Sequence, residues 1–296
     1  MRFEKWQALG NDYLIVEQRQ LSFELNAARV RLLCDRHGGV GSDGVLLLSP
    51  PRDRADVAEL RIFNPDGSEA ELSGNGARQA FLYLRRRGWT ASDSFSIHTA
   101  AGRIATSITG DFACRVDMGH ARLQSADFPG GAPDGGGELN VAGDRRWRFQ
   151  HVSIGNPQCA IRVAELSELE ALDLAAIGPP IEGHAAFPNR TNVSWYTALE
   201  PGPPARIRAR IFERGVGETR SSGTGACGAA VAYLLAAPDR AEQDAAPAGH
   251  VTVELDGGEL EVQVDAELGV ALSGWALPVF AGRLDERLLA ELRLAT

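Results

Sequence analysis

The sequence predicts an α+β fold built from two similar halves. Short runs in which apolar and polar residues alternate are separated by glycine-rich turns, which is typical of sheets with tight connections. Two pairs of motifs recur along the chain at nearly the same spacing. The 296 residues also suffice for two domains at a prior of about 150 residues each, and they can bury a large core.

The periodicity of apolar residues places the elements of the first half. Alternation predicts strands and a 3.6-residue period predicts helices. The expected strands cover 2–7, 13–17, 44–49, 58–63, 94–98, 103–107 and 113–117, and the expected helices cover 25–36 and 74–87. After these, a segment rich in Gly, Pro and Asp at 125–138 is typical of a linker.

The motifs that recur point to duplication. LSGNGARQAFLYL and SSGTGACGAAVAYLL share a Ser-Gly-polar-Gly opening followed by small and apolar residues. Their serines, Ser73 and Ser222, lie 149 positions apart, and Asn11 in LGND lies 145 positions before Asn156 in IGNP. Two matches in the same order, each at close to half the chain length, indicate that one α+β unit occurs twice. We expect domains at 1–118 and 119–271, with 272–296 returning to the first domain or covering the cleft.

Composition narrows the class of protein. The net charge is −9 and the arginines are scattered, which argues against nucleic-acid binding. No apolar run reaches the roughly 18 residues of a membrane span, and the N-terminus has no apolar block ending in a cleavage site, so a cytoplasmic protein is expected. The four cysteines are isolated singles, which indicates neither a disulfide framework nor a metal site: Cys34, Cys114, Cys159 and Cys227.

Each repeated motif places a serine just before a glycine-rich helix start. Unpaired N–H groups and the helix dipole favour an anion there, so two such starts are suited to a carboxylate. The alternative is that Ser73 and Ser222 only cap their helices, since serine is a preferred capping residue.

Further polar residues surround these motifs. Asn64 lies in a tight turn, Asn192 precedes an expected strand, and Glu213 with Arg214 ends a strand ahead of the second serine. A Glu-Arg pair at a strand end is usually a surface ion pair of little energetic value. Its position beside a glycine-rich anion site favours a functional role.

A family resemblance rests on many ordered motifs. They are LGND, DRHGGVGSDGVLLL, FNPDGSEAELSGNGAR, HTAAG, SIGNP, NRTNV, ERGVGETRSSGTGAC and VFAGRL. With these motifs the chain resembles the diaminopimelate epimerase family over nearly its whole length. The resemblance implies two pseudo-symmetric α/β domains, each a β-barrel-like sheet around a central helix, with the active site in the cleft between them. It also implies an isomerase of lysine biosynthesis that inverts an amino-acid α-carbon without pyridoxal phosphate or metal, acting as a homodimer.

The resemblance assigns roles by position. In the family one cysteine removes the α-proton and a second returns a proton from the opposite face. These cysteines fall on Ser73 and Ser222 here, and the histidine after the second GNP falls on Gln158, so three positions depart from the family. Glu213 is expected to assist the chemistry. The implied substrate contacts are all present: Asn11, Asn64, Gly74, Asn75, Asn156, Asn192, Glu213, Arg214, Gly223 and Thr224.

The two serines leave three interpretations open. A serine hydroxyl is a weak base that needs an activating partner, and losing one proton-transfer group costs about 10²–10⁴ in rate. The chain is therefore an epimerase that engineered serines freeze for substrate binding, a diverged enzyme acting on another amino acid, or a catalytically silent amino-acid-binding or regulatory protein. Asp43 and Glu213 are candidate general bases if they are buried, and His184 is a further candidate because it precedes the FPNRTNV loop.

Overall fold

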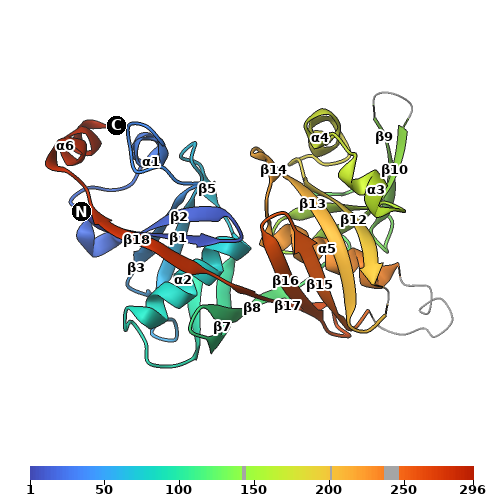
Figure 1. Cartoon of the computed structure of the whole chain (residues 1–296), viewed down its shortest axis with the longest axis horizontal. Helices are drawn as coiled ribbons and strands as arrows, with labels where there is room; N and C mark the ends of the chain where they lie inside the picture. Colours follow the sequence, from blue (N-terminus) through green and yellow to red (C-terminus); the bar gives the residue numbers. More distant parts are fainter. Residues whose placement is uncertain (142–144, 201, 237–246) are drawn as a thin grey trace. The chain divides into compact units, whose positions relative to one another are not determined.

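The computed structural model describes residues 1–141, 145–200, 202–236 and 247–296. They form two compact units, the first made of Met1–Val116 with Gly274–Thr296 and the second of Asp117–Ser273 (Figure 1). The prediction of a linker at 125–138 was wrong, because this segment lies inside the second unit. Its aromatic residue Phe128 packs against the rings of Phe149 and Phe187, which holds the segment on that unit's core.

The first unit holds a mixed sheet and three α-helices. Its elements are β1 (Arg2–Ala8), β2 (Asn11–Glu17), η1 (Gln18–Gln20), α1 (Ala27–Cys34), β3 (Val45–Ser49), β4 (Glu59–Phe63), β5 (Glu69–Ala70), α2 (Gly74–Arg86), β6 (Ser94–Thr99), β7 (Gly102–Gly110), β18 (Leu277–Arg283) and α6 (Glu286–Leu294). The strands and helices expected in the first half are confirmed, with ends that differ by at most three residues.

The second unit repeats this pattern. Its elements are β9 (Gly136–Val141), β10 (Arg145–Ser153), β11 (Pro157–Arg162), α3 (Leu166–Glu170), α4 (Leu174–Glu182), β12 (Asn192–Glu200), β13 (Ala205–Glu213), β14 (Gly217–Thr219), α5 (Gly223–Leu235), β15 (Gly249–Leu255) and β16 (Gly258–Val264). Strands β8 (Ala113–His120) and β17 (Gly269–Trp275) carry the chain across the boundaries of the units.

Strand pairing shows the repeat directly. In the first unit β1–β2 is antiparallel, β2–β3 parallel, β3–β4 antiparallel, β4–β6 parallel and β6–β7 antiparallel. The second unit has the same series in β10–β11, β11–β12, β12–β13, β13–β15 and β15–β16. The short strands β5 and β14 pair with β4 and β13, and each leads into the helix that bears a repeated serine. The duplicated α+β architecture is thus confirmed.

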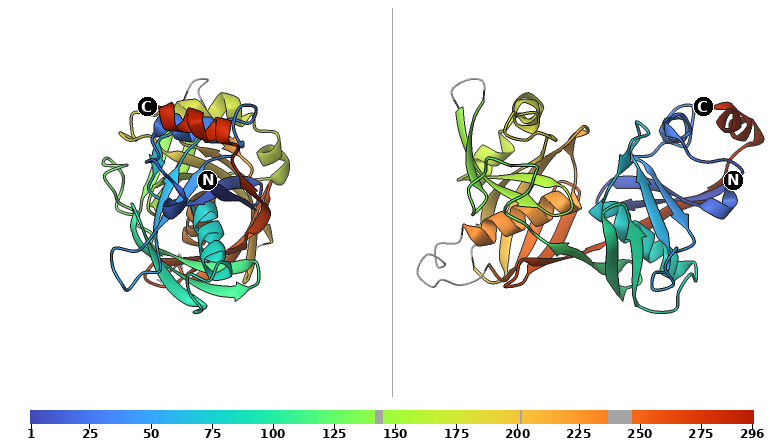
Figure 2. Two further views of the ribbon diagram at one scale, coloured as in Figure 1. Left: turned by 90° about the vertical axis from the view of Figure 1, so that its left-hand side faces the viewer. Right: turned by 180° about the vertical axis from the view of Figure 1, so that it is seen from behind.

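The two serine-bearing helices are core helices. Every residue from Gly74 to Leu84 in α2 and from Gly223 to Ala232 in α5 is buried, whereas a surface helix buries only one face. Helix α5 contacts the strands β10, β11, β12, β13, β15 and β16 of its own unit, and Figure 2 shows it lying among them. Glycine and alanine dominate its first turns, which lets strand side chains approach its backbone closely.

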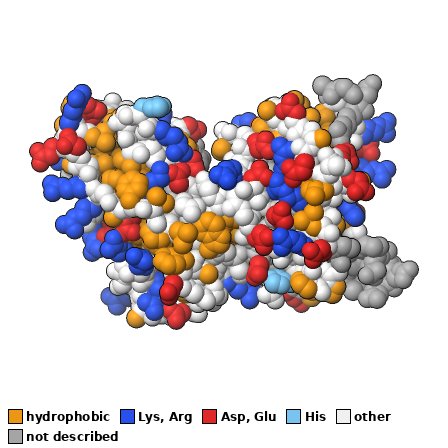
Figure 3. All heavy atoms as spheres, viewed as in Figure 1, with side chains coloured by type: hydrophobic (Ala, Val, Ile, Leu, Met, Phe, Trp, Pro, Cys, Tyr) orange, Lys and Arg blue, Asp and Glu red, His pale blue; other side chains and the backbone are white. Residues whose placement is uncertain are grey.

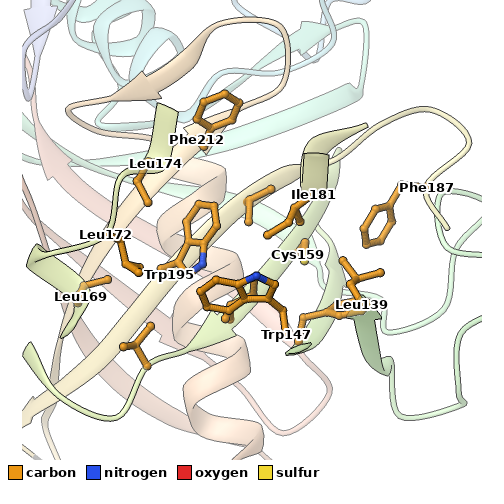
Figure 4. Close-up of a cluster of buried hydrophobic side chains, with 14 residues drawn as sticks. Leu139, Trp147, Cys159, Leu169, Leu172, Leu174, Ile181, Phe187, Trp195 and Phe212 are labelled. Atoms are coloured by element: carbon orange, nitrogen blue, oxygen red, sulfur yellow. The ribbon is translucent and has the colours of Figure 1, made fainter. Parts of the chain in front are cut away.

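The second unit has an aromatic core beside α3 and α4. Trp147 and Trp195 meet edge to face with ring centroids 6.1 Å apart, and aliphatic residues of both helices surround them (Figure 4). Aromatic side chains of this size bury large apolar areas, so this cluster anchors the strand that begins at Asn192. The strand end carrying a predicted site residue is therefore rigidly placed.

The C-terminal segment belongs to the first unit. Strand β18 pairs antiparallel with β1, and α6 lies beside α1. Arg29 on α1 donates from Nε to the carbonyl of Leu292 at 2.7 Å. On the face shown in Figure 3, both basic and acidic side chains occur on each of the two units. Among the helices of the described ranges, none has the length and apolarity that crossing a bilayer requires.

Candidate active site

Ser73 begins helix α2 and contacts an aromatic hydroxyl. Its backbone is extended, and its Oγ accepts a hydrogen bond from the Gly76 N–H at 3.0 Å, which is the geometry of an N-cap. The Tyr13 hydroxyl also donates to Ser73 Oγ, at 3.4 Å. The capping role is therefore real, but the hydroxyl of Ser73 additionally meets a titratable group.

A buried arginine organises the start of α2. The Arg78 side chain is fully buried and donates to the Gly74 carbonyl at 3.1 Å and to Asn75 Oδ1 at 2.7 Å. These bonds fix the two residues that the motif predicts as substrate contacts. A cation so close to the first helical turn adds to the positive dipole end and favours an anionic ligand there.

Asn11 is held beside α2 by two residues. Gln79 of α2 donates to the Asn11 carbonyl at 3.0 Å, and Asn11 Nδ2 donates to Asp43 Oδ2 at 3.2 Å. Burial raises the pKa of the Asp43 carboxyl, although Arg36 lies 2.8 Å from it. The Asp43 oxygens are thus engaged in fixing Asn11 and Arg36, and the role of Asp43 as a candidate general base stays a prediction.

Asn64 is bonded within its own turn. Its Nδ2 donates to Ser68 Oγ at 3.0 Å, and its carbonyl accepts from the Gly67 N–H at 2.9 Å. The sequence prediction of a tight turn is confirmed, while the predicted substrate contact of Asn64 stays a prediction.

Ser222 begins helix α5 and differs from Ser73 in its partner. Its Oγ accepts from the Gly225 N–H at 3.2 Å and donates to Glu213 Oε2 at 3.0 Å. Thr219 Oγ1 donates to the other carboxylate oxygen of Glu213 at 2.7 Å. Two hydroxyls therefore orient the Glu213 carboxylate toward the helix start. In this arrangement a carboxylate can take the proton of a hydroxyl such as that of Ser222 and so activate it.

A chain of amides continues from the second helix start. Asn156 donates to Thr224 Oγ1 at 3.2 Å and accepts from Gln158 Nε2 at 2.6 Å. Gln158 is fully buried, and its side chain lies over Gly228, where an added Cβ would come within 2.8 Å of the Gln158 Cβ. Gln158 therefore positions Asn156, which in turn is bonded to Thr224 at the helix start.

Asn192 connects the next strand to Arg214. Its Oδ1 accepts from the Arg214 backbone N–H at 2.9 Å, and its Nδ2 donates to the Pro157 carbonyl at 3.1 Å. The Arg214 guanidinium donates to the Asn189 carbonyl at 3.0 Å. The expected Glu213–Arg214 pair is thus divided between two tasks, because Glu213 faces the serine and Arg214 faces the NRTNV loop.

The structure groups the predicted residues by unit. In the first unit, Ser73, Gly74, Asn75 and Asn11 gather around the start of α2. In the second unit, a larger group gathers around the start of α5: Ser222, Gly223, Thr224, Asn156, Gln158, Asn192, Glu213 and Arg214.

Sequence reasoning missed Tyr13, Arg78 and Thr219. Tyr13 had a signal, because LGNDY aligns with IGNPQ in the repeat, so Tyr13 occupies the position equivalent to Gln158. Arg78 and Thr219 had none, since a buried arginine and a threonine beside a carboxylate become visible only after folding.

Other candidate acid–base groups lie elsewhere. All four cysteines are free and buried, and burial raises the pKa of Cys34, Cys159 and Cys114, the last to about 11. His184 Nδ1 accepts from the Ala186 N–H at 3.1 Å within its own turn. Within the described ranges no three His, Cys, Asp or Glu side chains are grouped to bind a metal.

Comparison with known proteins shows the family of this chain. The sequence model of the diaminopimelate epimerase family matches residues 3–124 and 150–273. A diaminopimelate epimerase from Synechococcus sp. (strain JA-2-3B'a(2-13)) is 43% identical over 290 residues, covering 95% of this chain and 97% of that protein. One from Desulforudis audaxviator is 41% identical over 290 residues, covering 96% and 99%.

Solved structures share the fold at low identity. A probable proline racemase from Agrobacterium radiobacter K84 superposes with a TM-score of 0.66 at 14% identity, covering 96% of this chain and 93% of that one. A Bacillus anthracis phenazine biosynthesis protein of the PhzF family gives 0.64 at 18% identity, covering 96% and 99%. With matching motifs in both halves and relatives aligned over nearly their full lengths, this chain belongs to the diaminopimelate epimerase family.

Proposed function

We propose that this protein is a cofactor-independent diaminopimelate epimerase, an isomerase of lysine biosynthesis, that works with serines where the family has cysteines. The hydrogen bond from Ser222 Oγ to Glu213 at 3.0 Å carries the proposal. A serine hydroxyl alone is too weak a base to remove an α-proton, but an oriented carboxylate supplies the missing basicity. The site thus retains a base without a thiol.

Substrate binding follows from the two helix starts. The N–H groups at Gly74–Asn75 and Gly223–Thr224 bind the substrate carboxylate and stabilise the negative charge that develops as the α-proton leaves. Arg78 strengthens the first of these starts. The remaining polar groups of the substrate are held by Glu213, Arg214 and four asparagines: Asn11, Asn64, Asn156 and Asn192.

Proton removal proceeds through Ser222. Its Oγ takes the α-proton as a new O–H bond forms, and its original proton passes to Glu213 Oε2, so the carboxylate becomes the acid and the α-carbon the carbanion. The pair acts as one base, with Thr219 holding the second carboxylate oxygen. Because serine is intrinsically less suited to this step than a thiolate at a helix start, we expect slower turnover than a two-thiol site gives.

The proposal also covers the shape of each sheet, the domain boundaries and the oligomeric state. Each sheet closes in a β-barrel-like manner around its central helix, which the six strands contacting α5 support. We place the domains at 1–118 and 119–271, each bearing one of the two serines, and the protein acts as a homodimer without a cofactor.

A second candidate is an amino-acid-binding protein without turnover. The observation that favours it is the state of the thiols: neither helix start carries a cysteine, and all four cysteines are buried elsewhere. Such a protein would keep the helix-start anion sites and gain stability from ligand, by a few kcal/mol at saturation.

Proton NMR in D₂O with diaminopimelate tests the proposal. We expect the unmodified protein to exchange the α-proton for deuterium and to invert the centre. The variants S222A and S73A should each lose inversion by about 10²-fold or more. The double variant S73C/S222C should be faster than the wild type, while S221C, which places a thiol one position before the cap, should not.

The alternatives give different results. Ligand-induced stabilisation without exchange in the wild type, and exchange in S73C/S222C, would identify a silent binding protein. Exchange with another amino acid and not with diaminopimelate would identify a diverged substrate.

A further inference from the structure

The hydroxyls of the two repeated serines are polarised in opposite directions. Ser73 Oγ accepts hydrogen bonds from the Gly76 N–H and from the Tyr13 hydroxyl, at 3.0 and 3.4 Å. Ser222 Oγ instead accepts one hydrogen bond, from the Gly225 N–H, and donates its own hydrogen to Glu213. Equivalent positions of a repeated unit thus carry different hydrogen-bond patterns.

Counting lone pairs assigns a direction to each serine. A hydroxyl has one donor hydrogen and two acceptor lone pairs. At Ser73 two donors occupy both lone pairs, so the O–H is the part that faces a third partner. At Ser222 the hydrogen is given to Glu213 and one lone pair is left for a third partner. Ser73 is therefore set to donate a proton, and Ser222 is set to accept one.

The Tyr13 ring is held rigidly. Its side chain is buried, and a Cβ added at Gly44 would lie 2.6 Å from Tyr13 Cε1, so the ring rests directly on the Gly44 backbone. The Leu14 N–H next to Tyr13 donates to the Gly44 carbonyl at 3.0 Å. The hydroxyl consequently stays beside Ser73 without a conformational change.

We infer that Tyr13 is a proton-relay residue that makes Ser73 the acid of the reaction, which extends the proposed function and depends on it. The Ser73 O–H bond breaks as the new Cα–H bond forms, and the Tyr13 proton moves to Ser73 Oγ. The carbanion's charge ends on the Tyr13 phenolate, which regains a proton from water. Tyr13 acts through Ser73 and does not itself touch the α-carbon.

Among the described residues of the second unit, the position equivalent to Tyr13 offers no such relay. The residue equivalent to Tyr13 is Gln158, whose amide is turned to Asn156 and does not titrate. A carboxylate only accepts hydrogen bonds and a phenol has an O–H to give, so the Glu213 side is suited to act as the base and the Tyr13 side as the acid.

Tyr13→Phe tests the relay, because it keeps the ring that packs on Gly44 and removes only the hydroxyl. Both epimers of the substrate are incubated with enzyme in D₂O, and exchange and inversion are followed separately. For the epimer whose α-proton faces Ser222, we expect exchange to continue while inversion falls by about 10²-fold or more. For the other epimer, both exchange and inversion should fall together.

Tyr83→Phe is the matched control. Tyr83 is a buried tyrosine on the same helix as Ser73, but its hydroxyl donates to Glu17 at 2.9 Å. Its loss should leave the ratio of inversion to exchange unchanged for both epimers. An unchanged ratio in Tyr13→Phe would overturn the relay, as would an equal fall of exchange and inversion for both epimers, which a purely structural role gives. A wild-type protein that exchanges neither epimer refutes the proposed function itself, and the relay with it.

Discussion

Replacing Glu213 by glutamine distinguishes the role of its carboxylate as a base from its role in holding the start of α5 in place. Glutamine keeps the length of the side chain and one acceptor oxygen, but it removes the charge and places an NH₂ donor against one of two hydroxyls. Ser222 and Thr219 donate to the two Glu213 oxygens at 3.0 and 2.7 Å, so one of these bonds is lost or reversed whichever way the amide turns.

The expected loss is much larger for catalysis than for stability. Removing a positioned general base lowers rates by about 10²–10⁴, which corresponds to about 2.7–5.4 kcal/mol at 1.36 kcal/mol per tenfold change. Hydrogen bonds to a charged group contribute about 1.5–3 kcal/mol and neutral ones about 0.5–1.5, so about 1–2 kcal/mol of folding free energy is expected to be lost. The variant should therefore be folded and nearly inactive.

The assay is α-proton exchange of diaminopimelate in D₂O, measured beside a thermal melt. Glu218→Gln is the control, because Glu218 lies on β14 of the same hairpin and pairs with Arg210 at 2.6 Å near the surface, where an ion pair contributes about 1 kcal/mol or less. If Glu213→Gln exchanged the α-proton at the wild-type rate, the role of Glu213 as the base behind Ser222 would be refuted.

Three further predictions concern the rest of the molecule. Burial lowers the pKa of His151, so the neutral side chain stabilises the fold above about pH 6.5, and this stabilisation is lost as the pH falls through the lower folded-state pKa. Between pH 7.5 and 5 the melting temperature should therefore fall less in His151→Gln than in the wild type. Parallel curves for the two proteins would contradict this. Gly228→Ala should cost about 1–3 kcal/mol in a urea melt and displace Gln158, whereas Gly130→Ala, whose Cβ meets open space, should be neutral; equal melts would refute the close contact. The four buried thiols should react with a thiol reagent only after denaturation, and fast reaction of the native protein would show that one is accessible.

The sequence alone determined the repeat and the elements that bear it. Alternation and glycine placed the strands of the first half because side-chain periodicity is a local property of the backbone. Both serine-glycine motifs became N-caps of buried helices, as a small polar residue before unpaired N–H groups predicts. The prediction of a linker at 125–138 was wrong because Gly and Pro indicate turns but not where a turn packs. Phe128 and aromatic partners distant in sequence hold this segment on the core of the second unit.

Only the tertiary structure decided what each site residue contacts. Glu213 and Arg214 are neighbours in sequence, yet one faces Ser222 and the other the Asn189 carbonyl, because successive side chains at a strand end point in opposite directions. The Tyr13–Ser73 contact joins residues 60 positions apart. The sequence thus fixes local geometry through the backbone, whereas partners for the two serine hydroxyls arise from strand pairing and helix burial, which depend on the whole of each unit.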